Sequence, residues 1–368
     1  MTIILLSNYF NHHQKPICDV FHRITYGNFT FVATEKVSEW RKKLGYQELT
    51  APYVIECNED SKDEIEHMLF NADVVITDGE HLNLTKRRYD AGKITFRYAE
   101  RLFKSKLRYL KMPVHAIKAW KTRRMYMLCS SAFTAHDFNL MGFYKNRSFK
   151  WGYFPINRFY PDNQEIVNAK ERNSILWVGR LIDWKHPEAP IEVAKMLRDR
   201  NREFTMNIIG TGAMEDELLR MIKSYDLSDS VHMLGPKSPD EVRSYMENSE
   251  IFLFTSDEGE GWGAVLNESM NSGCAVVASN KIGSAPFLIE NGVNGFLFES
   301  ENWDDLSMLV EKLVFDKSLR IKTSLSAIDT INNKWCAEQA AKNFIQLVEC
   351  LRDGKDCSII HGPCSPTN

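Results

Sequence analysis

The sequence predicts an α/β protein built from two parallel-sheet domains. The chain has 368 residues, and at roughly 100–200 residues per domain this length favours two domains. Short apolar runs of strand length recur along the whole chain. In the second half they alternate with segments of helical periodicity, and this alternation is typical of right-handed βαβ crossovers and parallel sheets.

Apolar runs define the predicted strands. In the first half they occupy residues 3–7, 30–34, 53–56, 73–77, 94–98 and 125–131. In the second half they occupy residues 175–179, 204–210, 231–235, 251–256, 274–279 and 295–298. The clearest helical segments lie between the later strands, at residues 187–200, 214–226 and 239–249.

A weakly patterned polar stretch with two prolines, residues 153–174, separates the two halves. We therefore expect a first domain over residues 1–158 and a second over residues 159–334. The amphipathic segment 335–352 predicts a last helix that packs across the domains. Residues 353–368 contain glycines and prolines and are expected to be loosely ordered.

Composition indicates an ordinary globular protein, with 43% hydrophobic and 26% charged residues. No run approaches the roughly 18 apolar residues that would cross a bilayer, and the amino terminus lacks the basic region of a secretory signal. Eight cysteines are scattered without CxxC pairs. This pattern favours reduced thiols over a disulfide framework or a zinc site, and so a cytoplasmic protein.

Four loops that follow predicted strands of the second half carry glycines and charged or polar side chains. In chain order, the notable residues are Arg180 and Lys185, then Gly210 and Gly212, then Glu260, Gly261 and Gly263, then Gly283 and Ser284. Ligands of open α/β sheets bind at the carboxyl ends of the strands, where these loops lie. Each loop alone would be weak evidence, because Gly-x-Gly after a strand is often only a tight turn and a pair of cations is often a solvated surface.

The residue types in these loops fit a ligand that is rich in both phosphate and hydroxyl groups. Glycines let backbone N–H groups approach a ligand, and Arg with Lys can neutralise a diphosphate. Glu260 and Glu268 would repel phosphate, so they more plausibly accept hydrogen bonds from hydroxyl groups. A nucleotide sugar combines the two kinds of group.

Residues 174–298 resemble the donor half of retaining, family 4 glycosyltransferases of the GT-B fold, through VGRLIDWK, IIGTG, HMLGPKSPDEV, EGWGAVLNE, SGCAVVAS and ENGVNGFL. The resemblance implies that Arg180 and Lys185 hold the donor diphosphate, that Glu260 contacts sugar hydroxyls and that Glu268 binds the ribose. It implies further donor contacts from the loops that contain Gly210, Gly212, Gly235, Pro236, Lys237, Gly261, Trp262 and Gly263. The fold it implies has two Rossmann-like domains facing a central cleft.

Two features of the second half bear on donor and metal. Many relatives have Pro-Glu after the CAVVAS strand, whereas this chain has Pro286 followed by Phe287, so the donor sugar is not specified. The chain contains no Asp-x-Asp, the pattern of a carboxylate-held divalent ion. We therefore expect no cofactor and no metal, with a nucleotide sugar as co-substrate and UDP preferred on family frequency.

The first half would bind the acceptor, and its candidate residues follow strands. His12 and His13 come after the first strand; they could be acceptor or donor groups, structural residues, or metal ligands, but no third ligand lies nearby. Many relatives have a His at the end of a first-domain strand, whereas Arg97, Glu100 and Arg101 occupy that region here. His81 is another candidate, and no general base is assigned. In this retaining class the leaving phosphate takes the acceptor proton.

The segment from Lys86 to Arg124 carries fourteen Lys and Arg against two acidic residues, a net charge of +12. Read as a helix, residues 100–111 place leucines and a phenylalanine on one side and cations on the other. We expect Lys104, Arg108, Lys111 and Trp120 to meet an anionic membrane surface or a lipid diphosphate. The alternative is a core-facing helix with a solvated basic face. No nucleic-acid-binding motif is present.

The first half also resembles enzymes that build bacterial capsular or O-antigen polysaccharide, through SNYFNHHQKP, ERLFK, LCSSAFTAHDF and SFKWGYFP. The resemblances imply a retaining hexosyltransferase that uses a nucleoside-diphosphate sugar and a lipid-linked glycan acceptor. It would be cytoplasmic and peripheral on the inner face of the cell membrane. Two alternatives stay open: a nucleotide-sugar epimerase of GT-B fold, and a non-catalytic nucleotide-sugar-binding partner of a membrane transferase.

Overall fold

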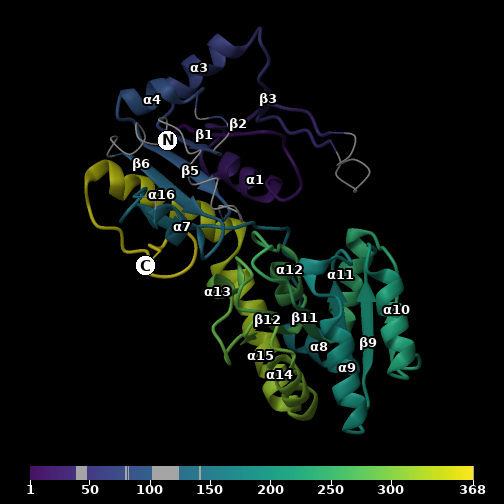
Figure 1. Cartoon of the computed structure of the whole chain (residues 1–368). Coiled ribbons are helices and arrows are strands. Elements are labelled where there is room, and N and C mark those ends of the chain that lie inside the picture. Colours follow the sequence, from purple (N-terminus) through teal and green to yellow (C-terminus); the bar gives the residue numbers. More distant parts are fainter. Residues whose placement is uncertain (39–47, 79–80, 82, 102–123, 141, 368) are drawn as a thin grey trace. The chain divides into compact units, whose positions relative to one another are not determined.

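The computed structural model describes residues 1–38, 48–78, 81, 83–101, 124–140 and 142–367 (Figure 1). The chain divides into two compact units. Unit 1 comprises Met1–Ile156 and Lys334–Asn368, and unit 2 comprises Asn157–Asn333. Unit 1 therefore contains both ends of the chain, whereas unit 2 is one continuous segment. Among the described residues, no helix is long and apolar enough to cross a membrane.

Unit 1 is built on a seven-stranded parallel sheet in the order β3-β2-β1-β4-β5-β6-β7. Its strands are β1 (Ile3–Ser7), β2 (Phe29–Ala33), β3 (Val54–Glu56), β4 (Val74–Thr77), β5 (Thr95–Ala99), β6 (Met125–Cys129) and β7 (Ser148–Lys150). Six of these strands confirm predicted runs. The sequence did not predict β7, because three residues with one charge give no apolar run.

Helices cover this sheet because their apolar residues face it. They are α1 (Lys15–Ile24), α3 (Lys62–Asn71), α4 (Lys86–Asp90), α7 (Thr134–Leu140) and α16 (Ala337–Asp353). In α16, the ring of Phe344 lies 5.5 Å from Phe21 of α1, 5.0 Å from Phe96 of β5 and 5.9 Å from Trp151, between centroids. The predicted last helix is therefore present, and it packs within unit 1.

The tail after α16 is held in place, in contrast to the loose order expected from its glycines and prolines. Cys364 and Ser365 are buried, and Pro366 forms an antiparallel bridge with Phe149 of β7. Asn343 of α16 donates a side-chain hydrogen bond of 2.8 Å to the carbonyl of Pro363. Backbone pairing along the sheet edge orders this segment, and composition does not reveal such pairing.

Unit 2 contains a six-stranded parallel sheet in the order β10-β9-β8-β11-β12-β13. Its strands are β8 (Glu171–Val178), β9 (Thr205–Ile209), β10 (Val231–Met233), β11 (Ser249–Phe254), β12 (Ala275–Ser279) and β13 (Phe296–Phe298). This order matches that of the doubly wound dinucleotide-binding sheet, in which the direction of strand addition reverses between the first and fourth strands. Here that reversal lies between β8 and β11.

The helices of unit 2 include the three that periodicity predicted: α9 (Ala189–Asp199), α10 (Glu215–Ser224) and α11 (Pro239–Asn248). Ser238 and Glu241 form a capping box that starts α11, which stabilises the first turn by satisfying its free N–H groups. The other helical elements are α8 (Asn163–Asn168), η1 (Asp183–Lys185), α12 (Val265–Asn271), α13 (Ala285–Leu288), α14 (Trp303–Phe315), α15 (Lys317–Asp329) and η2 (Thr330–Lys334).

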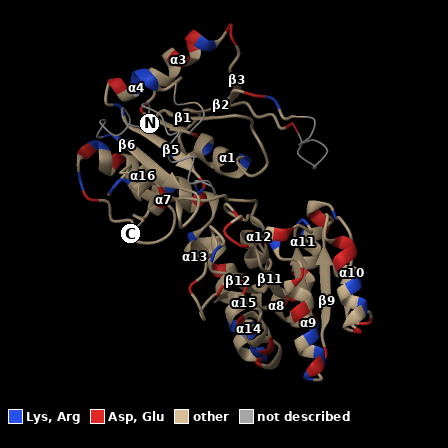
Figure 2. Cartoon of the chain, in the orientation of Figure 1, with Lys and Arg blue, Asp and Glu red and all other residues tan. Residues whose placement is uncertain are grey.

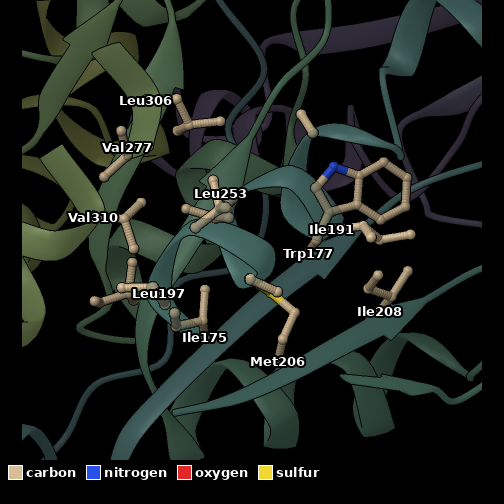
Figure 3. Packing of buried hydrophobic residues seen from close by; sticks show 14 of the residues in the cluster. Ile175, Trp177, Ile191, Leu197, Met206, Ile208, Leu253, Val277, Leu306 and Val310 are labelled. Atoms are coloured by element: carbon tan, nitrogen blue, oxygen red, sulfur yellow. The ribbon is translucent and has the colours of Figure 1, made fainter. Parts of the chain in front are cut away.

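Buried side chains on one face of this sheet form the largest core of unit 2. Figure 3 shows Ile175 and Trp177 of β8 beside Leu253 of β11, with residues of α9 and α14 packed over them. Charged residues occur along the helices α9 and α10, whereas β9 contains none (Figure 2). The apolar residues at the centres of β8, β9, β11 and β12 are buried, as expected for a parallel sheet covered on both sides.

Candidate functional site

The candidate site of unit 2 lies where the strand order reverses, between β8 and β11. The carboxyl ends of two neighbouring strands with diverging crossovers leave room for a ligand at this place. The loop after β8 contains Arg180 and Lys185, and the loop after β11 contains Glu260. The sequence placed these residues in separate loops, and the topology brings the loops to the same end of adjacent strands.

Lys185 and Glu260 meet directly. The Lys185 ammonium donates to a carboxylate oxygen of Glu260, and their side chains are only 14% and 12% exposed. The same carboxylate accepts a hydrogen bond of 3.1 Å from the hydroxyl of Ser256. A buried ion pair of this kind is costly to break by removing one partner. An anionic ligand at Lys185 would therefore change the partners of Glu260 as well.

Arg180 is exposed, and its guanidinium lies 5.5 Å from the ring centre of Trp184. The Lys185 ammonium lies 4.7 Å from the same ring. One indole therefore contacts both cations that the sequence assigned to a diphosphate. Such cation–π contacts orient side chains and leave their N–H groups available to other partners.

Backbone and buried side-chain hydrogen bonds join the loops after β8 and β11. The indole N–H of Trp177 donates to the hydroxyl of Thr255 at 2.8 Å, and that hydroxyl donates to the carbonyl of Lys185, also at 2.8 Å. The N–H of Asp257 donates to the carbonyl of Trp184 at 3.0 Å. The relative position of Lys185 and Glu260 is thus fixed by the backbone on which each one stands.

Gly210 and Gly212 are required by the close approach of two loops. A Cβ at Gly210 would lie 1.8 Å from the carbonyl oxygen of Gly179, and a Cβ at Gly212 would lie 2.3 Å from that of Leu181. The N–H of Leu181 also donates to the carbonyl of Thr211 at 3.0 Å. Packing between the loops after β8 and β9 therefore explains these two glycines without a ligand.

The next three candidates lie in the connection between β10 and α11. Gly235 has a positive φ of 67°, and its carbonyl accepts a hydrogen bond of 3.0 Å from the N–H of Gly210. Pro236 is exposed and Lys237 is half-buried. This connection is thereby joined to the loop after β9, at the same end of the sheet as Lys185.

The glycine-rich turn before α12 presents its backbone because its one large side chain is buried. Trp262 is 1% exposed, and its indole N–H donates to Asn267 at 2.9 Å. Gly263 has a φ of 81°, and a Cβ there would lie 2.5 Å from the ring of Phe254. Gly261 is half-buried. Only the backbone of Trp262 is available for a role in ligand binding.

Glu268 of α12 has a carboxylate that makes no hydrogen bond or ion pair within the described part of the chain. Burial raises its pKa, and the nearby guanidinium groups of Arg243 and Arg158 oppose that rise. Arg243 itself donates to the carbonyl of Glu268 at 3.1 Å and to Asn271 at 2.7 Å. A half-buried carboxylate without a protein partner is suited to accept hydrogen bonds from a ligand.

Sequence reasoning missed Arg243 and His186, and it gave no role to Ser284. Arg243 lay within a helical pattern and looked like a surface residue. The hydroxyl of Ser284 is buried without a hydrogen-bond partner among the described residues. His186 follows Lys185 directly and has a left-handed backbone, with φ 51°. The sequence alone does not show that His186 has a left-handed backbone or that the buried hydroxyl of Ser284 has no hydrogen-bond partner among the described residues.

In unit 1, two of the predicted candidates are linked through a tyrosine. The ring of His13 stacks on that of Tyr153 at 5.8 Å, and the Tyr153 hydroxyl donates to Glu100. Burial, with a smaller effect of His12, lowers the pKa of His13 to about 4, so its imidazole is neutral near pH 7. Tyr153 lies far from both partners in sequence, and the sequence did not indicate it.

The two arginine candidates of unit 1 contact α7 and the turn before it. Arg97 lies 4.9 Å from the ring centre of Phe138, and Arg101 lies 4.9 Å from that of Phe133. Arg101 also forms a 3.4 Å ion pair with Asp137. Both guanidinium groups therefore pack on aromatic rings.

His81 lies at the carboxyl end of β4, next to the reversal of strand order in the sheet of unit 1. Its Nδ1 is 2.7 Å from Asp78, and its Nε2 is 2.6 Å from the hydroxyl of Thr34. No three His, Cys, Asp or Glu side chains of the described residues form a group that could hold a metal ion. Lys104, Arg108, Lys111 and Trp120 lie outside the described residues.

Comparison with solved structures identifies the class of fold. The Anabaena protein HepE in complex with UDP superposes with a TM-score of 0.68 and 14% identity, covering 96% of this chain and all of that one. The apo lipopolysaccharide outer core galactosyltransferase WaaB gives a TM-score of 0.66 and 16% identity, covering 96% and 100%. The chain therefore has the GT-B fold of two Rossmann-like domains, as predicted.

Residues 161–328 match the family model described as glycosyl transferases group 1. A relative is the amylovoran biosynthesis glycosyltransferase AmsK of Erwinia amylovora, 30% identical over 51% of this chain and 48% of that protein. Another is the Campylobacter jejuni N-acetylgalactosaminyltransferase acting on a diphospho-undecaprenol substrate, 31% identical over 43% of each chain. The chain spans about half the length of the curated relatives it matches.

Proposed function

We propose that the chain is a glycosyltransferase of cell-surface polysaccharide synthesis. It transfers a hexose-type sugar from a nucleoside diphosphate, preferably UDP, to a lipid-linked glycan with retention of configuration. The observation that carries the proposal is the pairing of Lys185 with Glu260 at the reversal of the unit 2 sheet, within the segment that matches the group 1 glycosyltransferase model. The relatives named above support the pathway, since amylovoran and the diphospho-undecaprenol-linked glycan are both built by sugar transfer.

The donor half of the proposal follows from charge. Arg180 and Lys185 bind the diphosphate, because both are cations in the loop at the carboxyl end of β8. Arg180 is the exposed one of the two. Once Lys185 faces phosphate, Glu260 accepts hydrogen bonds from sugar hydroxyls, and the backbone of the turn 261–263 lies along the sugar and phosphate. The unpartnered carboxylate of Glu268 accepts from the ribose hydroxyls. The HepE structure with UDP supports uridine as the base.

In the transfer step, the acceptor hydroxyl oxygen bonds to the anomeric carbon while the bond from that carbon to the diphosphate oxygen breaks. The acceptor proton moves to the departing diphosphate on the same face of the sugar. Cations at the diphosphate stabilise the charge that develops on it, which is the largest contribution in sites of this kind. We also propose that the reaction needs no metal ion and that residues 104–120 hold the enzyme on the inner face of the membrane.

A thermal-shift panel tests the donor assignment first. A ligand at 100 times its Kd stabilises the folded protein by about 2.7 kcal/mol. UDP, GDP, ADP and phosphate should be compared, then the sugar-bearing forms of the best nucleotide, each with and without EDTA. We expect one nucleoside diphosphate to raise Tm selectively, with or without chelator. A panel without any shift would argue against the donor site.

A further inference from the structure

His186 has a left-handed backbone conformation, which is uncommon for a residue other than glycine. Its φ of 51° and ψ of 56° lie in the left-handed region, which L-residues other than Gly, Asn and Asp visit at a cost. The residue directly follows Lys185 and ends η1. Such outliers persist where the surroundings hold them in place, and they are concentrated at functional sites.

The imidazole of His186 lies among three carboxylates from three different loops. Its Nδ1 is 2.8 Å from Glu188, at the start of α9, and its Nε2 is 3.9 Å from Asp257, after β11. Glu301, after β13, is the third acidic neighbour, and the ring of Trp303 lies 5.4 Å from the imidazole. Nε2 of His186 and the second carboxylate oxygen of Glu188 are both buried without a hydrogen bond among the described residues.

Asp257 begins the turn that carries Glu260. Its carboxylate accepts a hydrogen bond from the N–H of Gly259, and its carbonyl accepts one of 3.2 Å from the N–H of Glu260. The second carboxylate oxygen faces His186 at ion-pair distance, beyond hydrogen-bond range. The position of Asp257 therefore determines the position of the Glu260 backbone.

We propose that His186 is a positioning residue for the donor site: as an imidazolium between Glu188 and Asp257, it holds the turn 257–260, and hence Glu260, against Lys185. The inference rests on the proposed function for its consequence, because what it positions is the donor-binding carboxylate. The exposed fraction of the imidazole side chain, 13%, keeps this interaction partly shielded from solvent. The left-handed backbone is what directs the ring toward the loop after β11.

The charge on His186 makes this device sensitive to pH. The hydrogen bond with Glu188 raises the pKa of His186 above its ordinary value of 6.5, burial opposes that rise, and Asp257 and Glu301 add to it. Because the pKa in the folded state is raised, the stabilisation is fully present below pH 6.5 and is lost as the pH rises through the higher folded value. The turn is thus tightest in mildly acidic to neutral solution.

Hydrogen exchange of residues 255–264 in the full chain, without ligand, tests the proposal directly. Wild type is compared with His186→Asn, which tolerates the left-handed backbone and cannot carry the charge. Between pH 6 and pH 8.5, after correction for intrinsic exchange, we expect protection of this segment to fall about fivefold in wild type. Protection of this segment should be independent of pH in His186→Asn. The control replaces His232, a half-buried histidine of β10, and His232→Asn should behave as wild type.

A second variant and a second readout keep the outcomes separate. Glu188→Gln should lower the pH at which protection is lost, and it also serves if His186→Asn does not fold. Affinity for the UDP-sugar that binds best, measured over the same pH range, should fall in wild type and stay level in His186→Asn. Equal pH dependence of exchange in wild type and His186→Asn would overturn the inference. Absence of UDP binding in wild type would instead refute the proposed donor, while the exchange result still decides the role of His186.

Discussion

In unit 2, the loops that carry candidate residues are joined through the backbone, whereas in unit 1 the candidates meet through side chains. The loops after β8, β9 and β11 exchange N–H to carbonyl hydrogen bonds, as between Leu181 and Thr211. In unit 1, the Tyr153 side chain connects His13 with Glu100. Backbone bonding fixes a loop whatever its side chains, so Lys185 and Glu260 can exchange their mutual ion pair for contacts with a ligand while the loops stay in place. The side-chain contacts of unit 1 occupy the candidate groups themselves.

The largest expected effect tests whether Glu260, on its backbone-held loop, contacts the donor sugar during transfer. We expect Glu260→Gln to reduce sugar transfer by about 100- to 1000-fold, since one transition-state contact of this kind contributes about 3–4 kcal/mol. The amide keeps the shape of the side chain, so the backbone-held loop should stay folded. Transfer of labelled sugar from the best nucleotide donor measures the effect. Glu258→Ala, an exposed carboxylate two residues earlier in the same loop, should leave transfer unchanged; an equal loss in both variants would assign the effect to loop disruption.

The second prediction concerns the backbone side of the comparison. Gly210→Ala places a methyl group against the carbonyl of Gly179 at a φ of 147°, and overpacking together with backbone strain should cost about 3 kcal/mol or more. Chemical denaturation followed at unit 2 measures the loss. Gly235→Ala is the matched control: its φ is also positive, but nothing lies within 4 Å of the added carbon. It should cost only about 1–2 kcal/mol. Similar losses in both would mean that the loop packing around Gly210 has been misjudged.

The third prediction uses the buried histidine of unit 1. Because the folded pKa of His13 is about 4 and the ordinary value is about 6.5, the unfolded chain takes up the proton first as the pH falls. Unit 1 should therefore lose stability between pH 6.5 and pH 4, by up to about 3 kcal/mol at about 1.4 kcal/mol per pKa unit. Urea denaturation over this range measures it. His13→Gln should flatten the curve, while the control variant His22→Gln in α1 should not. A curve unchanged by His13→Gln would place the acid sensitivity elsewhere.

The same contrast explains how much could be predicted from the sequence. Parallel strands, and the position of the loops that carry Lys185 and Glu260 at the same end of the unit 2 sheet, follow from alternating periodicity and the rule that ligands bind at strand ends. Tyr153 and His186 could not be predicted in this way. Tyr153 contacts His13 and Glu100, which are distant from it in sequence. The placement of His186 depends on its left-handed backbone angle φ. The bridge between Pro366 and Phe149 could not be predicted either, because it depends on where the tail lies relative to the edge of the sheet.

The smallest effect sharpens the comparison at Glu268, a half-buried carboxylate that has no partner in the described chain. Glu268→Gln removes a charge that burial makes costly, as its raised pKa indicates, so the free energy of unfolding should be unchanged or slightly higher. The affinity for the nucleoside diphosphate should nevertheless fall about tenfold, because an amide accepts fewer hydrogen bonds from the ribose hydroxyls than a carboxylate does. Calorimetric titration with UDP measures this affinity. The control is Glu247→Gln, because the Glu247 carboxylate accepts hydrogen bonds from Arg158 and Tyr160. This variant should have lower stability and unchanged affinity for UDP. If both variants lost stability and neither lost affinity, Glu268 would be a structural residue, and the ribose would have to be bound from another element of unit 2.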